Sequence, residues 1–137
     1  MKEHKFICDR NLGKLAKYLR LAGYYCLWDN NLSKTKIVNL AKKKRLIILT
    51  RNKTFFNRND KSKKIKIKSD NVLMQLTELK GFIFFDEKKL FSRCSKCNSV
   101  LKKNTEESET FCLKCRKKYW FGSHARELKE KFKLRLR

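Results

Sequence analysis

The sequence contains no proline and only four glycines in 137 residues, which excludes collagen-like and other low-complexity chains rich in these residues. Long apolar runs are also missing. The longest, at residues 46–49 and 82–85, fall far short of the roughly 20 residues that span a bilayer. The first residues lead directly into a strand-like run, without the apolar segment of a signal peptide. We therefore expect a cytoplasmic protein, neither integral to a membrane nor secreted.

Acidic residues are scarce, because 13 Asp and Glu oppose 37 Lys and Arg, which gives a formal net charge of +24. A charge of this size favours polyanionic partners, such as nucleic acid or an anionic membrane surface. Hydrophobic residues make up 41% of the chain, which is enough for a buried core and excludes wholesale disorder. The length is that of one compact domain of ordinary size.

Strand-like and helix-like segments alternate along the first part of the chain. We expect strands at residues 6–8, 24–28, 46–50 and 65–67, and helices at residues 12–22, 33–41 and 70–81. Ser33 is suited to cap the second helix, and Asp70 or Asn71 to cap the third. This alternation predicts an α/β fold in which helices flank a parallel sheet.

The pattern of alternating helix-like and strand-like segments ends near residue 90. From there, short strands are interrupted by pairs of cysteines, and the last 13 residues carry six Lys or Arg and two Glu among regularly spaced apolar residues. We therefore divide the chain into an α/β domain at 1–89, a cysteine-rich unit at 90–124 and a basic tail at 125–137. The tail has the pattern of a basic amphipathic helix.

Four of the six cysteines form two C-x2-C pairs with fourteen residues between them. The first pair is Cys94 and Cys97, and the second is Cys112 and Cys115. Two such pairs supply the four thiolates of a tetrahedral structural zinc site. Disulfides and an iron–sulfur centre are the alternatives. We expect Zn2+ to be structural here, because about 35 residues cannot build a core of their own.

Asp9 and Asp29 each follow an apolar strand directly. The carboxyl ends of parallel strands converge on one edge of the sheet, so these carboxylates are expected to share a Mg2+ or Mn2+ ion there. Asp is also common at helix caps, and spacing alone does not separate the two interpretations. The third strand is followed by Asn52, a neutral and weaker ligand, and Asp70 and Glu78 are further acids that the third helix explains equally well.

Basic residues are concentrated in a few segments. Residues 51–68 hold eight Lys or Arg against one acid, a net charge of +7, and the tail has a net charge of +4. Such residues bind phosphates without reading sequence. The expected contacts to nucleic acid are Lys14, Lys17, Arg20, Arg51, Lys53, Arg58, Lys63, Lys64, Lys117 and Lys118. Aromatic rings at 55–56 and 119–121 either stack on unpaired bases or pack in the core.

The sequence resembles the Mut-seven carboxy-terminal RNase family, which joins a PIN-like nuclease domain to a zinc ribbon. The matching residues lie in order between 6 and 124. They include the segment from Asp9 to Tyr24, the run at 48–52, both cysteine pairs and the motif Tyr119-Trp120-x-Gly122-Ser123-His124. The resemblance implies a metal-dependent ribonuclease with Asp9 and Asp29 in its acidic site. The family usually has Asp where this chain has Asn52.

Two functional hypotheses follow. The first is a Mg2+- or Mn2+-dependent endoribonuclease acting on structured RNA, such as ribosomal or transfer RNA, with Asp9, Asp29 and Asn52 as its catalytic residues. The alternative is a PIN-like protein with impaired catalysis that binds RNA or the ribosome. Asn52, and the neutral residues Asn30, Asn31 and Ser33 after the second strand, favour this alternative. A DNA-binding regulator is a weaker idea, because no helix-turn-helix pattern is present.

Overall fold

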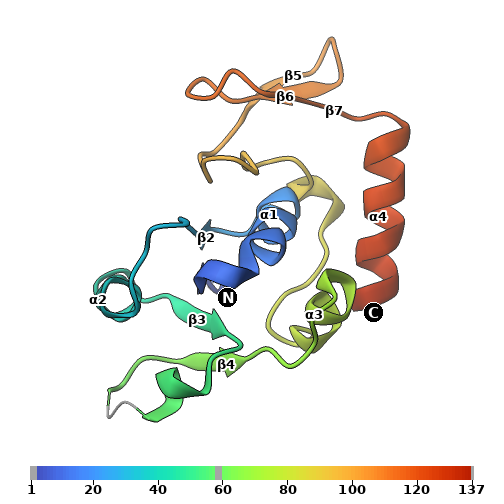
Figure 1. The fold of residues 1–137 in the computed structure, drawn as a ribbon. Coiled ribbons are helices and arrows are strands. Elements are labelled where there is room, and N and C mark those ends of the chain that lie inside the picture. Colours follow the sequence, from blue (N-terminus) through green and yellow to red (C-terminus); the bar gives the residue numbers. More distant parts are fainter. Residues whose placement is uncertain (1–2, 58–59, 137) are drawn as a thin grey trace.

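The computed structural model describes residues 3–57 and 60–136. Four parallel strands form a sheet of order β2-β1-β3-β4, with helices on both of its faces (Figure 1). The strands are β1 (Phe6–Cys8), β2 (Cys26–Leu27), β3 (Ile47–Thr50) and β4 (Lys64–Lys66). The α-helices of this part are α1 (Gly13–Leu21), α2 (Lys34–Lys44) and α3 (Val72–Glu78). The predicted α/β class with a parallel sheet flanked by helices is confirmed.

Alternating side chains of the central strands supply two separate apolar layers. Phe6 and Leu49 join the larger core, which also contains residues of α1 and α3. Ile7 and Ile48, which lie one position away, pack instead with residues of α2. Because successive side chains of a strand point to opposite faces, three layers result: α1 and α3, the sheet, and α2.

The ends of the elements follow local hydrogen bonds. Ser33 Oγ accepts from the backbone N–H of Lys36 at 3.2 Å and caps α2, as the sequence predicts. Asn71, the second of the two residues predicted for the next cap, accepts from the backbone N–H of Leu73 at 2.9 Å and begins α3. Strand β2 is shorter than the predicted 24–28, because the N–H of Tyr24 donates to the carbonyl of Leu19 and extends the turn that ends α1. Three 3-10 turns, η1 (Arg10–Leu12), η2 (Lys53–Asn57) and η3 (Glu87–Lys89), lie in the connections.

The cysteine-rich segment forms a second, antiparallel sheet of order β5-β6-β7. Its strands are β5 (Lys102–Asn104), β6 (Glu109–Phe111) and β7 (Lys118–Trp120). We call residues 90–121, which hold this sheet and both cysteine pairs, the ribbon.

The predicted tail helix is α4 (Ser123–Leu136), which runs from the ribbon back along α3 (Figure 1). Phe132 is completely buried, and its ring stacks on Phe85 with 5.3 Å between ring centroids. Ala125, Leu128 and Phe132 of the tail therefore belong to the protein core, whereas its basic residues and Leu134, which is 66% exposed, face solvent.

Arg20 attaches the ribbon to the α/β part. This residue of α1 is only 4% exposed. Its Nε donates to the carbonyl of Cys26 at 2.8 Å, and its Nη1 donates to the carbonyls of Ser95 at 3.0 Å and Lys96 at 3.3 Å. The guanidinium group is therefore buried and occupied by structural hydrogen bonds, which argues against the predicted contact of Arg20 with RNA.

The ribbon also covers β2, the edge strand of the parallel sheet, next to the contact of Arg20. The backbone N–H of Cys26 in β2 donates to the side-chain oxygen of Asn98 at 3.0 Å, so the ribbon satisfies an edge strand that would otherwise be unpaired. Gly23 (φ +94°) lets the connecting segment pass close to α1, because a Cβ atom there would lie 2.6 Å from the carbonyl oxygen of Lys89.

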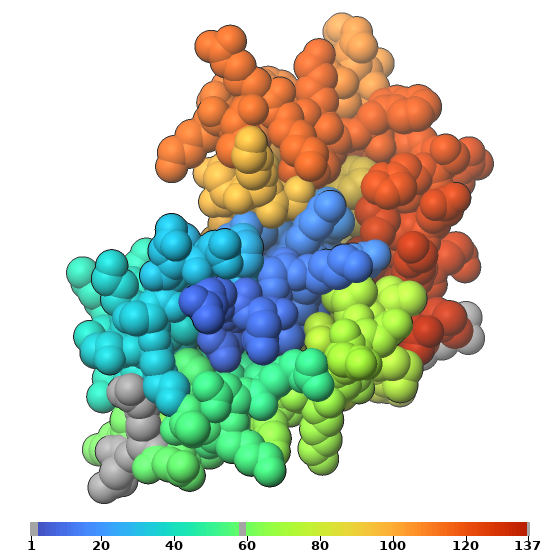
Figure 2. Space-filling view, viewed as in Figure 1, coloured from blue at the N-terminus to red at the C-terminus, as the bar shows by residue number. Residues whose placement is uncertain are grey.

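One buried core crosses all three predicted units, since it contains Phe6, Cys112 and Phe132 together. The boundaries at 89 and 124 stay a prediction about sequence organisation. In the space-filling view, α1 reaches the surface between the ribbon, α3 and α4 (Figure 2). Within residues 3–57 and 60–136, no helix combines the length and the apolar character that crossing a bilayer requires.

Replacement of Arg20 by Ala is expected to lower the free energy of unfolding by about 2–4 kcal/mol, because three buried carbonyls lose a charged donor. Chemical denaturation of the full chain measures this loss. Lys17→Ala, which changes an exposed cation on the same helix, is the matched control and is expected to change stability by less than about 0.5 kcal/mol. Equal effects of the two substitutions would contradict the structural role of Arg20.

Candidate functional site

Asp9 lies at the carboxyl edge of the parallel sheet, directly after β1. Its Oδ2 accepts a hydrogen bond from Thr50 Oγ1 at 2.8 Å, and its Oδ1 accepts from the backbone N–H of Arg10 at 2.8 Å. The second bond makes Asp9 the N-cap of η1. Each carboxylate oxygen retains a further lone pair, so these bonds orient the group and leave it able to hold a cation.

An open polar cavity of about 370 Å3 adjoins this carboxylate. Its lining consists of Asp9, Arg10, Asn11, Arg51 and Asn52. We call it the acidic-edge cavity. Both arginines are exposed, and a guanidinium group matches the geometry of a phosphate. The cavity therefore presents one carboxylate and two phosphate-binding groups to solvent.

Asp29 reaches the same edge from the neighbouring strand. The register pairs Phe6 with Cys26 and Ile7 with Leu27, so both Asp9 and Asp29 follow the carboxyl ends of paired strands. Asp29 is exposed, and its Oδ1 accepts from the backbone N–H of Asn31 at 2.9 Å. It does not line the acidic-edge cavity. Both carboxylates therefore lie at one edge of the sheet, but the capping interpretation holds only for Asp9, because Ser33 caps α2 and Asp29 orders the turn before it.

Asn52 lines the cavity but uses its side-chain oxygen elsewhere. That oxygen accepts from the backbone N–H of Thr54 at 3.0 Å and from the Thr54 hydroxyl at 2.8 Å. Both lone pairs of the amide oxygen are therefore occupied, which argues against Asn52 as a metal ligand. Its role in this geometry is to order the turn into η2.

Glu78 lies at the next strand end along this edge, because it binds residues that follow β4, the parallel neighbour of β3, but it does not line the acidic-edge cavity. Glu78 accepts from the backbone N–H groups of Lys68 at 2.8 Å and Ser69 at 2.9 Å. Burial raises the pKa of Glu78, but these hydrogen bonds outweigh it and hold the pKa below its usual value. In the described part of the chain, the only cluster of three or more His, Cys, Asp or Glu side chains is the cysteine cluster.

Sequence reasoning missed Thr50 and Arg10. Thr50 is fully buried at the end of β3 and fixes Asp9 across the strand pair. Only the register of β1 and β3 brings the two residues together. The matching run at 48–52 contains Thr50 but does not indicate its contact with Asp9. Arg10 follows Asp9 in the sequence, and this adjacency was the available signal.

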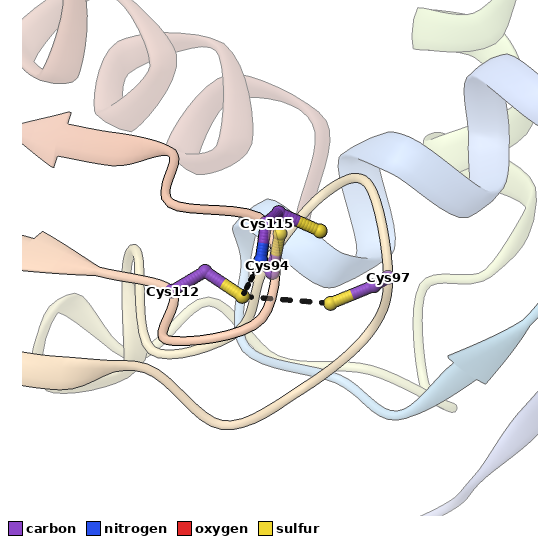
Figure 3. Close-up of side chains that lie close together, drawn as sticks. All are labelled: Cys94, Cys97, Cys112 and Cys115. Atoms are coloured by element: carbon purple, nitrogen blue, oxygen red, sulfur yellow. Dashed lines mark hydrogen bonds between the residues drawn. The ribbon is translucent and has the colours of Figure 1, made fainter.

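The sulfur atoms of the four paired cysteines all lie within 4.8 Å of one another (Figure 3). The Sγ atoms of Cys97 and Cys112 are 3.6 Å apart. Four sulfurs around one Zn2+ at about 2.3 Å lie close to 3.8 Å from each other. The cluster is therefore compatible with a closed four-cysteine zinc ribbon, in which zinc would be structural rather than catalytic.

The two cysteine pairs have the same backbone form. The N–H of Asn98 donates to the carbonyl of Cys94 at 2.8 Å, and the N–H of Arg116 donates to that of Cys112 at 2.8 Å. Asn98 and Arg116 both have positive φ, at 72° and 60°. Each turn thereby brings two thiols to one point, which is the arrangement that a tetrahedral ion needs.

Tyr119 contacts this cluster through its hydroxyl group. Its buried hydroxyl lies 3.4 Å from Cys94 Sγ. Burial raises the pKa of Cys94, but hydrogen bonds from Tyr119 and from the backbone N–H groups of Cys97 and Lys96 lower it below its usual value. Cys8 and Cys26 differ, since burial raises the pKa of Cys8 well above its usual value and both side chains belong to the core.

The predicted phosphate contacts occupy three separate places. Arg51 and Lys53 are exposed near the acidic-edge cavity, while Lys14, Lys17, Lys117 and Lys118 are exposed on α1 and the ribbon. Lys63 is exposed before the amino end of β4, on the opposite edge of the sheet from Asp9. The Lys64 side chain is only 7% exposed and pairs with Asp60 at 3.0 Å, which argues against a phosphate contact. Arg58 lies outside the described residues.

The aromatic residues divide between core and surface. Phe55 and Tyr119 are buried, whereas Phe56, Trp120 and Phe121 are 43%, 64% and 42% exposed. Packing therefore explains the first two rings, and three rings are accessible to a ligand.

Metal analysis of the purified chain is expected to give one zinc per molecule. Cys97→Ser removes one of the four thiolates and is expected to abolish stoichiometric zinc. Cys8→Ala leaves all four thiolates in place and is expected to keep the metal. Less than half an equivalent of zinc in fresh wild-type protein would contradict the assignment.

Comparison with known proteins gives one finding. The family model described as the Mut7-C RNAse domain matches residues 4–132. This span includes the acidic edge and the whole ribbon, and it extends into α4 beyond the residues on which the resemblance rests. Neither the curated proteins nor the solved structures give a match. Since the matched residues make up nearly the whole chain, the protein belongs to the Mut7-C RNAse domain family.

Proposed function

We propose that this protein binds RNA and cleaves it as a Mg2+- or Mn2+-dependent endoribonuclease, with structured RNA such as ribosomal or transfer RNA as its substrate. The main support for this proposal is that hydrogen bonds orient the Asp9 carboxylate in an open cavity that Arg10 and Arg51 also line. Membership of an RNase domain family and the net charge of +24 support an RNA substrate.

The donor groups fit a magnesium ion. Mg2+ in proteins is commonly held by one or two carboxylates, while waters and substrate phosphates complete its coordination. Asp9 and Asp29, which follow paired strand ends, supply such a pair. Bound there, the ion would activate water and offset charge on a phosphodiester. The chain itself positions the carboxylate through Thr50 and offers Arg10 and Arg51 to the phosphates.

A second candidate function is RNA binding without cleavage. It is favoured by Asn52, whose amide oxygen is fully used by Thr54, and by Asp29, which does not line the acidic-edge cavity. The basic surface would then bind RNA or the ribosome, while the acidic edge would bind a cation too weakly for turnover.

Incubation of structured RNA with the wild-type chain is expected to give cleavage only when Mg2+ or Mn2+ is added. Asp9→Asn keeps the size of the side chain but removes the charge. We expect it to reduce cleavage about a hundredfold or more. Glu106→Gln, which changes an exposed acid in the turn between β5 and β6, is the control and is expected to keep wild-type activity.

Full activity of Asp9→Asn would contradict the proposed site. A wild-type chain that binds RNA tightly but does not cleave it with either metal would favour the second candidate. In that case Asn52→Asp tests whether one added carboxylate restores cleavage.

Affinity for RNA is expected to fall steeply as salt rises, because phosphate contacts release counterions. Arg51→Gln is expected to lower the slope of log affinity against log salt by about one, since it removes one phosphate contact. Lys43→Gln, at an exposed position of α2, is the control and is expected to leave the slope unchanged. Fluorescence anisotropy at several salt concentrations measures both slopes, and identical slopes for Arg51→Gln and the wild type would contradict the role of Arg51.

A further inference from the structure

A second cavity lies where α1, the ribbon and the start of α4 meet. It has a volume of about 280 Å3. The side chains that give it its character are Lys17 from α1, Lys117, Lys118 and Trp120 from the β7 region, and His124 from α4. We call it the Trp120 cavity. Residues about a hundred positions apart in the sequence thus meet at one surface.

Trp120 is exposed although it is a large aromatic residue. The indole is 64% exposed. Side chains along β7 alternate between buried and exposed: Tyr119 is buried, whereas its neighbours Lys118 and Trp120 are exposed. Burial in the core therefore does not explain this ring, unlike that of Tyr119.

The exposed ring is nevertheless held in place. A Cβ atom at Gly122 would lie 2.3 Å from Trp120 Cζ3 and 2.6 Å from Cε3 and Cη2. The six-membered part of the indole consequently rests against the backbone of Gly122. A ring fixed in this way loses little conformational entropy when it binds a planar ligand.

The surroundings of the ring are cationic. Lys17, Lys117 and Lys118 are exposed, and no acidic residue lines the cavity. Lys118 also pairs with an acid outside the cavity, since Glu109 Oε1 lies 3.9 Å from Lys118 Nζ. Lys117 Nζ lies 5.4 Å from the centre of the Tyr119 ring. An accessible indole among three lysines matches a planar base that carries phosphates.

We propose that the Trp120 cavity binds an unpaired nucleotide of RNA, with its base stacked on the indole of Trp120 and its neighbouring phosphates held by Lys17, Lys117 and Lys118. This inference depends on the proposed function in one respect, namely that RNA is the partner. Stacking needs a free base face, so the cavity selects single-stranded segments over continuous duplex.

The location of the cavity connects it to the acidic edge. Asp9 and η1 precede the first turn of α1, whereas Lys17 and Leu21, which line the cavity, lie on its later turns. Lys14 and Lys17 are both exposed and lie three positions apart, on one face of the helix. The rise of about 1.5 Å per residue puts Lys14 and Leu21 about 10 Å apart along the axis. A single strand held at Trp120 can therefore follow this face of α1 toward Asp9.

The test measures affinity of the full chain for a short single-stranded oligouridylate and for an RNA duplex of the same length, at fixed salt and without added Mg2+ or Mn2+. Trp120→Ala is expected to weaken single-strand binding about tenfold, and Trp120→Phe to weaken it less. Gly122→Ala, which displaces the ring, is expected to act like Trp120→Ala. Duplex affinity should change little in all three. Phe84→Ala removes a ring that is also 64% exposed but lies outside the cavity, and it is expected to bind as the wild type.

A second measurement leaves Trp120 in place. The chain has two tryptophans, so Trp28→Phe isolates the emission of Trp120. Saturating oligouridylate is expected to quench this emission through stacking. Unquenched emission at saturation, or unchanged single-strand affinity in Trp120→Ala, would overturn the inference while RNA binding stands. A wild-type chain that binds neither RNA would overturn the inference and the proposed function together.

Discussion

The buried guanidinium group of Arg20 holds the two halves of this protein in one arrangement. It donates to one carbonyl of strand β2 and to two carbonyls of the first cysteine turn. Such a group is costly to bury, and the cost is offset only when all three carbonyls are in place. The ribbon that supplies two of them depends in turn on its cysteine cluster. Docking of the ribbon and closure of the sheet edge are therefore coupled, and zinc bound at the cysteine cluster would stabilise both. Helix α4 covers the same core with Phe132.

This coupling places two surfaces of different chemistry on opposite ends of α1. At its beginning, a carboxylate fixed by Thr50 lines one cavity together with two arginines. At its end, lysines surround an indole that rests on Gly122. A net charge of +24 would attract any polyanion without regard to a particular site, so affinity alone does not define a site. What distinguishes these two surfaces is a fixed group, a carboxylate in one and an aromatic ring in the other.

Much of the fold follows from sequence pattern. Periodic apolar residues and caps such as Ser33 locate the helices, and the paired cysteine spacing locates the cluster, because these signals act over a few residues. The burial of Arg20 could not be predicted from such local signals, since the carbonyl groups that it binds, those of Ser95 and Lys96, lie about 75 positions further along the chain. The same holds for Lys64, which is engaged by Asp60, and for Asn52, whose oxygen is used by Thr54. A basic or amide residue has the same appearance in a sequence whether it faces solvent or fills a tertiary contact.

The central claim is that the acidic edge and the ribbon form one RNA-binding surface along α1. Hydrogen–deuterium exchange of the full chain, with and without a saturating single-stranded RNA, tests it most directly. The account predicts slower exchange at residues 9–14 and 51–53 together with residues 117–124, and unchanged exchange at residues 39–44 of α2. Protection confined to residues 39–44, or to only one of the two predicted regions, would contradict it.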